Sequence, residues 1–151
     1  MNKEQSLNEA DGLCGEAQKA WSRACSLRDQ YDYNGCIEAA QHCIELAVKA
    51  LYVLVGLKYP KQHDPTVDLE EVIKRLEGLP DYQKVSIARA KWISKMWEWA
   101  HSTSIYGSLD VPASKIFTEK DANIAVEYAS EIHSCCYFII TMVLTRQIKI
   151  L

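Results

Sequence analysis

The stretch that decides the fold is residues 31–56, which read YDYNGCIEAAQHCIELAVKALYVLVG. Its apolar side chains recur at steps of four and three residues, at Tyr33, Ile37, Ala40, Ile44, Ala47, Leu51 and Leu54. This spacing is typical of a helix that packs lengthwise against other helices. Gly56 is expected to end the helix, because glycine takes a positive φ without a Cβ clash.

The same periodicity predicts helices on both sides of this stretch. We expect a long helix over residues 4–29, a short one over 68–77, a long one over 81–104 and a last one that starts near Thr118. The turn at residues 29–32 is so short that the first two helices must run antiparallel. No strand-like alternation is sustained anywhere. The predicted fold class is all-α, an antiparallel up-and-down bundle of four long helices plus one short helix, in a single domain over residues 1–151.

Two of the long helices carry predictions about packing. In the helix over residues 81–104, the stripe expected to face the core is Val85, Ala88, Trp92, Met96 and Trp99, widened by Ile93 and Trp97. At the start of the last helix, residues 117–122 (FTEKDA) read as a hydrophobic staple around a capping box. Beyond Ser134 this helix is apolar on nearly every face, so we expect a second subunit to dock at its end.

The composition excludes several classes of protein. The chain has 17 Lys and Arg against 20 Asp and Glu, so it lacks the broad basic surface of a protein that coats duplex nucleic acid. Its six cysteines fall within helical patterns, which favours reduced thiols over a disulfide scaffold. The start of the chain is polar, and the longest apolar run, residues 135–144, is about half of a membrane span. We therefore expect a cytoplasmic protein with no membrane segment.

A series of short motifs carries a family resemblance. They are Tyr33-Asn34, Ala39-Ala40-Gln41, residues 44–51 (IELAVKAL), Gly56, Tyr59-Pro60, His63-Asp64, Tyr106-Gly107, Pro112 and residues 117–122. In order and spacing they resemble the HEPN domain family, over residues 21–132. The resemblance implies a helical bundle that often forms a homodimer and works in nucleotide or RNA transactions. It also implies a common pairing with a nucleotidyltransferase in toxin–antitoxin or defence systems.

The resemblance further implies how catalytic members act: they cleave RNA without metal, using an arginine followed after four to six residues by a histidine. No arginine and histidine in this chain have that spacing. Lys95 precedes His101 with five residues between them, and such a pair can stabilise a phosphate and move protons. Lysine nevertheless lacks the bidentate guanidinium group. A ribonuclease that uses Lys95 and His101, with Tyr106 nearby, is therefore the alternative hypothesis.

The binding candidates are polar residues at helix edges and in one loop. Gln41, Glu45 and Lys49 lie four residues apart, where they either bind a phosphate or base or form an intrahelical ion pair. His63, next to Asp64, either presents an imidazole to a ligand or ties its loop to a helix.

Two further patterns favour structure over function. Lys84, Lys91 and Lys95 share one helix face, which is more typical of a solvated surface than of a phosphate track. His133 and Cys136 have the spacing of two zinc ligands, but no second pair accompanies them, so no metal or other cofactor is expected. The sequence thus favours a non-catalytic HEPN-like binding module that dimerises, with a ribonuclease or a purely structural dimerisation module as alternatives.

Overall fold

The computed structural model describes residues 2–59, 69–106, 111–112 and 115–151, and gives only the backbone of residues 94–106. The helices are α1 (Lys3–Asp29), α2 (Tyr33–Leu54), α3 (Leu69–Lys74), α4 (Asp81–Tyr106) and α5 (Glu119–Leu144). Two short strands, β1 (Leu76–Glu77) and β2 (Lys149–Ile150), pair antiparallel. The predicted all-α class, with four long helices and one short one, is confirmed.

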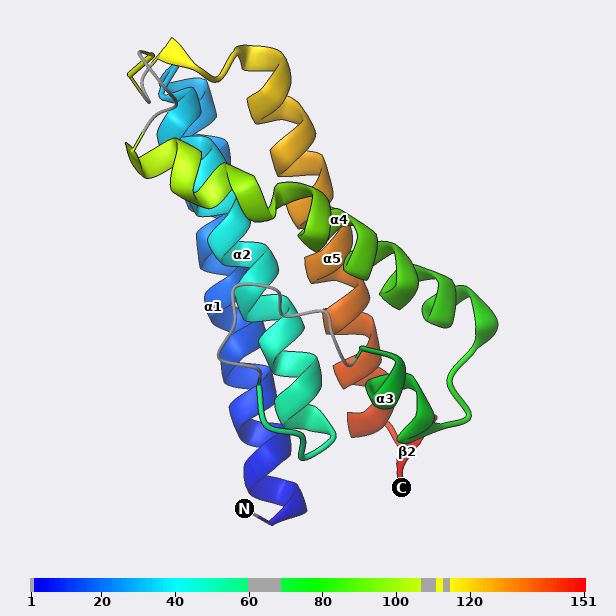
Figure 1. The fold of residues 1–151 in the computed structure, drawn as a ribbon. Helices are drawn as coiled ribbons and strands as arrows, with labels where there is room; N and C mark the ends of the chain where they lie inside the picture. The colour runs from blue at the N-terminus through cyan, green and yellow to red at the C-terminus, as the bar shows by residue number, and fades with distance from the viewer. Residues whose placement is uncertain (1, 60–68, 107–110, 113–114) are drawn as a thin grey trace.

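At the centre of the bundle, α2 and α5 run parallel to each other (Figure 1). The Cys36 Sγ atom lies 3.8 Å from the carbonyl oxygen of Ala122, and one heptad later the Cys43 Sγ atom lies 3.8 Å from that of Ala129. α1 packs along one side of this pair, and α4 crosses the other side obliquely (Figure 1). α1 and α2 therefore run antiparallel, as predicted, whereas α4 lies at an oblique angle to α2 and α5 (Figure 1).

The turn between α1 and α2 is built from local hydrogen bonds. Tyr31 takes a positive φ of 64°, and the N–H groups of Tyr31 and Asp32 donate to the carbonyls of Arg28 and Leu27, which is a Schellman motif. Asp32 then caps α2 by accepting a hydrogen bond of 2.9 Å from the Gly35 N–H. A Cβ on Gly35 would lie 2.5 Å from the Asp32 carboxylate, so a larger residue there would displace this carboxylate from its capping position.

The end of α2 confirms the role predicted for Gly56. Its φ is 72°, and its N–H donates to the Val53 carbonyl. The next N–H, of Leu57, donates to the Tyr52 carbonyl, which completes a second Schellman motif.

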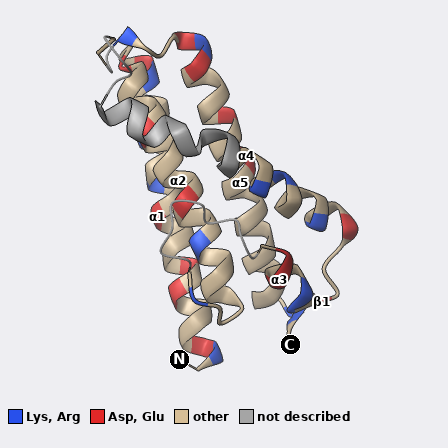
Figure 2. Cartoon of the chain, in the orientation of Figure 1, with Lys and Arg blue, Asp and Glu red and all other residues tan. Residues whose placement is uncertain are grey.

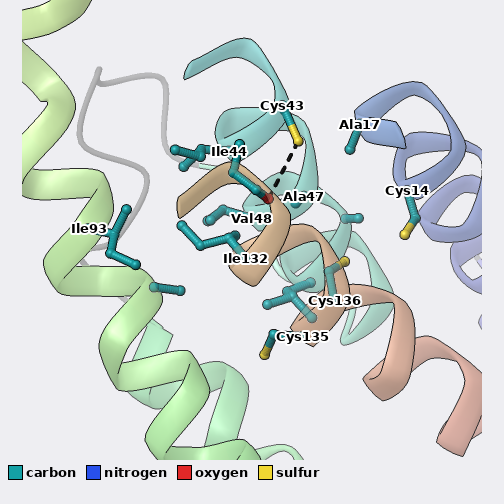
Figure 3. Close-up of a cluster of buried hydrophobic side chains, with 14 of the residues drawn as sticks. Cys14, Ala17, Cys43, Ile44, Ala47, Val48, Ile93, Ile132, Cys135 and Cys136 are labelled. Atoms are coloured by element: carbon teal, nitrogen blue, oxygen red, sulfur yellow. Dashed lines mark hydrogen bonds between the residues drawn. The ribbon is translucent and has the colours of Figure 1, made fainter. Parts of the chain in front are cut away.

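The predicted seam of α2 forms the middle of the core. From Ile37 to Leu54 its members are at most 4% exposed, and Tyr33 is half-buried. Ile93 of α4 and Ile132 of α5 point toward this helix from two sides (Figure 3). The stretch from which the fold was predicted is therefore the element that the other long helices contact.

α1 meets the bundle through small side chains. Its buried residues are Ser6, Ala10, Cys14, Ala17, Ala20 and Ala24. The larger apolar residues Leu13, Trp21 and Leu27 lie at the margins and are only partly buried. Because the separation of two packed helices depends on the side chains between them, this stripe lets α1 lie close to α2 and α5.

The stripe predicted for the core face of α4 was wrong at Val85, Ala88 and Trp92, which are exposed, and is confirmed at Ile93, which is buried. The buried residues on its described half are Gln83, Ile87, Ala90 and Ile93. Val85 is 66% exposed and Trp92 is 54% exposed, while Met96, Trp97 and Trp99 lie among the undescribed side chains. The described half of α4 therefore carries two apolar stripes at helical spacing, and the predicted one is the exposed one, although Trp92 packs edge-on against Tyr128 of α5 with 6.4 Å between ring centroids.

α5 begins as predicted. Thr118 is its N-cap, and the side chains of Thr118 and Asp121 accept reciprocal hydrogen bonds in a capping box. Phe117 and Ala122, the two residues of the expected staple, are both buried. At the other end, Tyr137, Phe138 and Leu144 are more than half exposed, so the bundle covers this apolar end only in part.

The chain ends in contact with the segment after α3. The short helix predicted over residues 68–77 stops at Lys74, because β1 follows and pairs with β2.

Lys and Arg residues are interspersed with Asp and Glu along the described helices (Figure 2). In the part of the chain that the structure describes, no helix combines the length and apolar character needed to cross a membrane.

Candidate functional site

Four of the site residues predicted from the sequence lie outside what the structure describes. Lys95, His101 and Tyr106 belong to the half of α4 whose side chains are not described. His63 lies in the undescribed segment between α2 and α3. The proposed catalytic pair, Lys95 and His101, therefore stays a prediction.

The three binding candidates on α2, Gln41, Glu45 and Lys49, lie in three different environments. Gln41 is 7% exposed, and its buried Oε1 has no hydrogen-bond partner among the described residues. Glu45 lines a groove between α1 and α2. Lys49 extends toward Tyr59, with its Nζ atom 5.9 Å from the ring centroid, which is a cation–π arrangement. The three side chains share a helix edge but face different surroundings.

The groove between α1 and α2 has a volume of about 620 Å³. Its charged and titratable lining residues are Glu16, Lys19, Arg23, Asp32, Glu38, His42 and Glu45. Lys19 already pairs with Glu16 at 2.7 Å. Since carboxylates outnumber the cations, the groove repels a phosphodiester, although Arg23 and His42 also line it.

A second cavity, of about 560 Å³, lies between α1 and α5 and has a different character. Its lining residues are Asp11, Cys14, Gly15, Gln18, Trp21, Ser130, His133, Ser134, Tyr137 and Phe138. Aromatic rings form its walls, and hydroxyl, amide, imidazole and carboxylate groups supply hydrogen-bonding positions. Trp21 is held in place by a hydrogen bond of 3.2 Å from its Nε1 to the Val126 carbonyl.

Cys14 and His133 both line this α1/α5 cavity. The neighbouring Cys136 and His133 hold the pKa of Cys14 below its usual range despite burial. The neighbouring Cys14 and complete burial raise the pKa of Cys136. The pKa values of these two thiols are therefore shifted in opposite directions.

The other core thiols have the opposite tendency. Burial raises the pKa of Cys36 to about 11 and the pKa values of Cys43 and Cys135 to about 12. Burial also raises the pKa of Cys25 at the end of α1. All six cysteines are free thiols, as predicted.

Sequence reasoning missed the α1/α5 cavity as a unit. It gave no role to Trp21, and it read His133 and Cys136 of α5 only as a possible metal pair. The cavity residues of α1 lie more than a hundred positions before those of α5, so no local spacing indicates the cavity. Among the described residues, no group of three or more His, Cys, Asp or Glu side chains is arranged to hold a metal ion.

Comparison with known proteins decides the family. A family model described as the HEPN domain matches residues 10–139. The chain belongs to the HEPN domain family. This HEPN domain is also similar in structure to TT1696 from Thermus thermophilus, with a TM-score of 0.66 and 19% identity, over 87% of this chain and 98% of that one. At this identity the likeness shows the fold alone. No curated protein matches this chain.

Gln41 is the residue of the Gln41, Glu45 and Lys49 row whose contribution to the stability of this HEPN domain can be tested directly. We expect Gln41→Met to raise the free energy of unfolding by about 1 kcal/mol, because it removes a buried acceptor without a partner and keeps the side-chain length. Urea denaturation followed by circular dichroism measures the change. The control Glu45→Met, at a partly exposed position, should change stability by less than about 0.5 kcal/mol. A loss of stability in Gln41→Met would contradict the interpretation that the Gln41 Oε1 is a buried acceptor without a partner.

Proposed function

We propose that this HEPN domain is a non-catalytic binding module that forms a homodimer and acts with a nucleotide- or RNA-handling partner of the toxin–antitoxin or defence type. A nucleotidyltransferase is the partner that the family resemblance favours. The bound ligand is a nucleotide or a single-stranded RNA base. The observation that carries the proposal is the aromatic-lined α1/α5 cavity.

The α1/α5 cavity suits a nucleobase in size and chemistry. Its volume of about 560 Å³ is within the range of small-molecule sites, roughly 300–1,000 Å³. Tyr137 and Phe138 are 53% and 55% exposed, so a base has aromatic faces on which to stack. The Asp11 carboxylate can accept from the exocyclic amino group of a base, which favours bases that carry one.

The charge pattern of α4 argues against binding of an RNA backbone along this helix. On the described half of α4, Lys84 pairs with Asp81 at 2.9 Å, Lys91 pairs with Glu70 at 3.3 Å, and Arg89 pairs with Glu131. Cations engaged in this way contribute less to phosphate binding than free ones do. This favours recognition of a base or a mononucleotide over extended backbone contacts.

Ligand binding is measured by calorimetry with the four ribonucleoside 5′-monophosphates and a short oligouridine. We expect amino-bearing bases to bind more tightly than uridine, and Phe138→Ala to weaken binding by roughly 5- to 150-fold, because stacking on an aromatic ring contributes about 1–3 kcal/mol per base. Tyr31→Ala, which removes an exposed ring outside the cavity, should leave the affinity unchanged. Binding that is indifferent to Phe138→Ala would place the ligand elsewhere, and no binding by any probe would favour a purely structural module.

Absence of catalysis is tested with labelled RNA and purified protein in the presence of EDTA. We expect no cleavage above that of a buffer control, because the chain lacks an arginine at the family's usual distance before a histidine. His101→Ala and Lys95→Ala are assayed beside the native chain. Cleavage by the native chain that both variants lose would establish the ribonuclease alternative and overturn the non-catalytic proposal.

The outer stripe of α4 supports the homodimer. We define it as Tyr82, Val85, Ala88 and Trp92, which recur at steps of three and four residues and are all exposed. A helical stripe of this kind fits into the grooves of another helix. A second copy of the chain supplies the same stripe, so a twofold axis makes the contact self-complementary. Tyrosine and tryptophan are also the residues that anchor such interfaces.

Sedimentation velocity at several concentrations tests this interface. We expect a dimer for the native chain and a more than tenfold weaker dimer for Val85→Glu, because an unpaired buried charge costs several kcal/mol. Val111→Glu is the matched control, since Val111 is exposed but lies outside the outer stripe of α4. Phe138→Glu tests the end of α5, the surface favoured by the sequence. Dissociation by Phe138→Glu alone would move the interface there, and a native monomer would contradict dimerisation.

A further inference from the structure

We propose that the α1/α5 cavity selects a nucleobase that carries a positive charge, such as an N-alkylated purine, and keeps phosphate groups outside. This selectivity rests on the proposed function, because it takes the cavity to be the site that binds the base. It goes beyond that function by specifying the charge of the part of the ligand that enters the cavity.

The described lining of the α1/α5 cavity contains a carboxylate, that of Asp11, and no lysine or arginine. Asp11 is exposed on α1 and forms no ion pair with any residue that the structure describes. Glu16, by contrast, is paired with Lys19 on the same helix. The charge of Asp11 is therefore uncompensated, so it attracts a cation in the cavity and repels a phosphate.

Aromatic rings reach the α1/α5 cavity from both helices. Trp21 comes from α1, and Tyr137 and Phe138 come from α5 and are more than half exposed. The Trp21 Nε1 already donates to the Val126 carbonyl at 3.2 Å, so the indole offers a ligand its face and not its N–H group. Since the face of an aromatic ring carries negative potential, these rings attract a cation more strongly than a neutral molecule.

The carboxylate and the rings favour the same kind of ligand. A neutral base gains stacking and a hydrogen bond to Asp11, whereas a cationic base gains in addition the attraction of the carboxylate and of the ring faces. A phosphate gains neither of these attractions. The ligand that fits the cavity best is therefore a flat cationic ring with an N–H donor.

The α1/α2 groove lacks this combination. Its described lining contains no aromatic residue, and it includes Lys19 and Arg23 beside its carboxylates. Ring faces next to a carboxylate without an ion pair thus distinguish the α1/α5 cavity from the other hollow beside α1.

Two methylated adenosines test the selectivity by calorimetry on the full chain at neutral pH. 1-Methyladenosine is a cation under these conditions and N6-methyladenosine is neutral, so the two differ in charge and in the position of a methyl group. We expect 1-methyladenosine to bind roughly 3- to 30-fold more tightly, the range expected when a cation meets aromatic faces. Adenosine should bind more tightly than adenosine 5′-monophosphate, because Asp11 repels the phosphate.

Asp11→Asn removes the charge and keeps the shape of the side chain. It should reduce the preference for 1-methyladenosine and strengthen the binding of adenosine 5′-monophosphate. Glu9→Gln is the matched control, since Glu9 is an exposed carboxylate on the same helix but outside the described lining, and it should change neither preference. His133→Gln, which removes the lining residue able to take a positive charge, should leave the preference for the cation in place.

Salt gives a second measurement on the native chain. Added salt screens an exposed carboxylate, because the Debye length is only about 10 Å at 0.1 M ionic strength. Raising the salt concentration should therefore weaken the binding of 1-methyladenosine and strengthen that of adenosine 5′-monophosphate. The binding of N6-methyladenosine, which is neutral, should hardly change.

The outcomes separate this selectivity from the proposed function. Equal affinities for the two methylated adenosines, or tighter binding of adenosine 5′-monophosphate than of adenosine, would overturn the selectivity and leave a nucleobase site in place. A preference for the cation that survives Asp11→Asn, or that Glu9→Gln abolishes equally, would also overturn it, because the cavity carboxylate would not be the cause. No binding of any nucleoside or nucleotide would instead refute the proposed function, and the selectivity with it.

Discussion

The close contact of α1 with α2 and α5, made through small side chains, is the constraint on which the rest of the structure depends. The buried stripe of α1 contains alanine, serine and cysteine and no larger residue. Each of these side chains buries little apolar area, so the stripe stabilises the bundle through many dispersion contacts at short range. Trp21 and Leu13 lie beside the stripe instead of within it. Large residues at the margin of a narrow contact line a hollow, and the α1/α5 cavity lies there.

The same demand for small residues places thiols between the helices. Cysteine is little larger than alanine and behaves as a small apolar residue in a core. Cys36 and Cys43 occupy equivalent positions one heptad apart, and both donate to carbonyls of α5. These two contacts therefore show which residues of α2 and α5 lie opposite each other. Cys14 and Cys136 satisfy the same steric demand between α1 and α5.

Local signals account for what the sequence predicted correctly. The seam of α2, the stop at Gly56 and the capping box at Thr118 each depend on residues within a few positions of one another. The core face of α4 was predicted wrongly at Val85, Ala88 and Trp92 because the described half of the helix has two apolar stripes, and periodicity does not say which one is buried. The β1–β2 pair and the α1/α5 cavity join segments that are far apart in sequence. Neither the strand pair nor the cavity produces a periodic pattern or a compositional bias in the sequence.

The geometry of the bundle allows its two candidate surfaces to act independently. α1 and α4 lie on opposite sides of the α2 and α5 pair (Figure 1). The α1/α5 cavity opens on the first side, and the outer stripe of α4 is on the second. A second copy of the chain packed on the stripe would therefore leave the cavity open. Ligand binding would couple to dimerisation through α2 and α5, each of which contacts both α1 and α4. A change in affinity on dimerisation therefore has to pass through the position of these two helices.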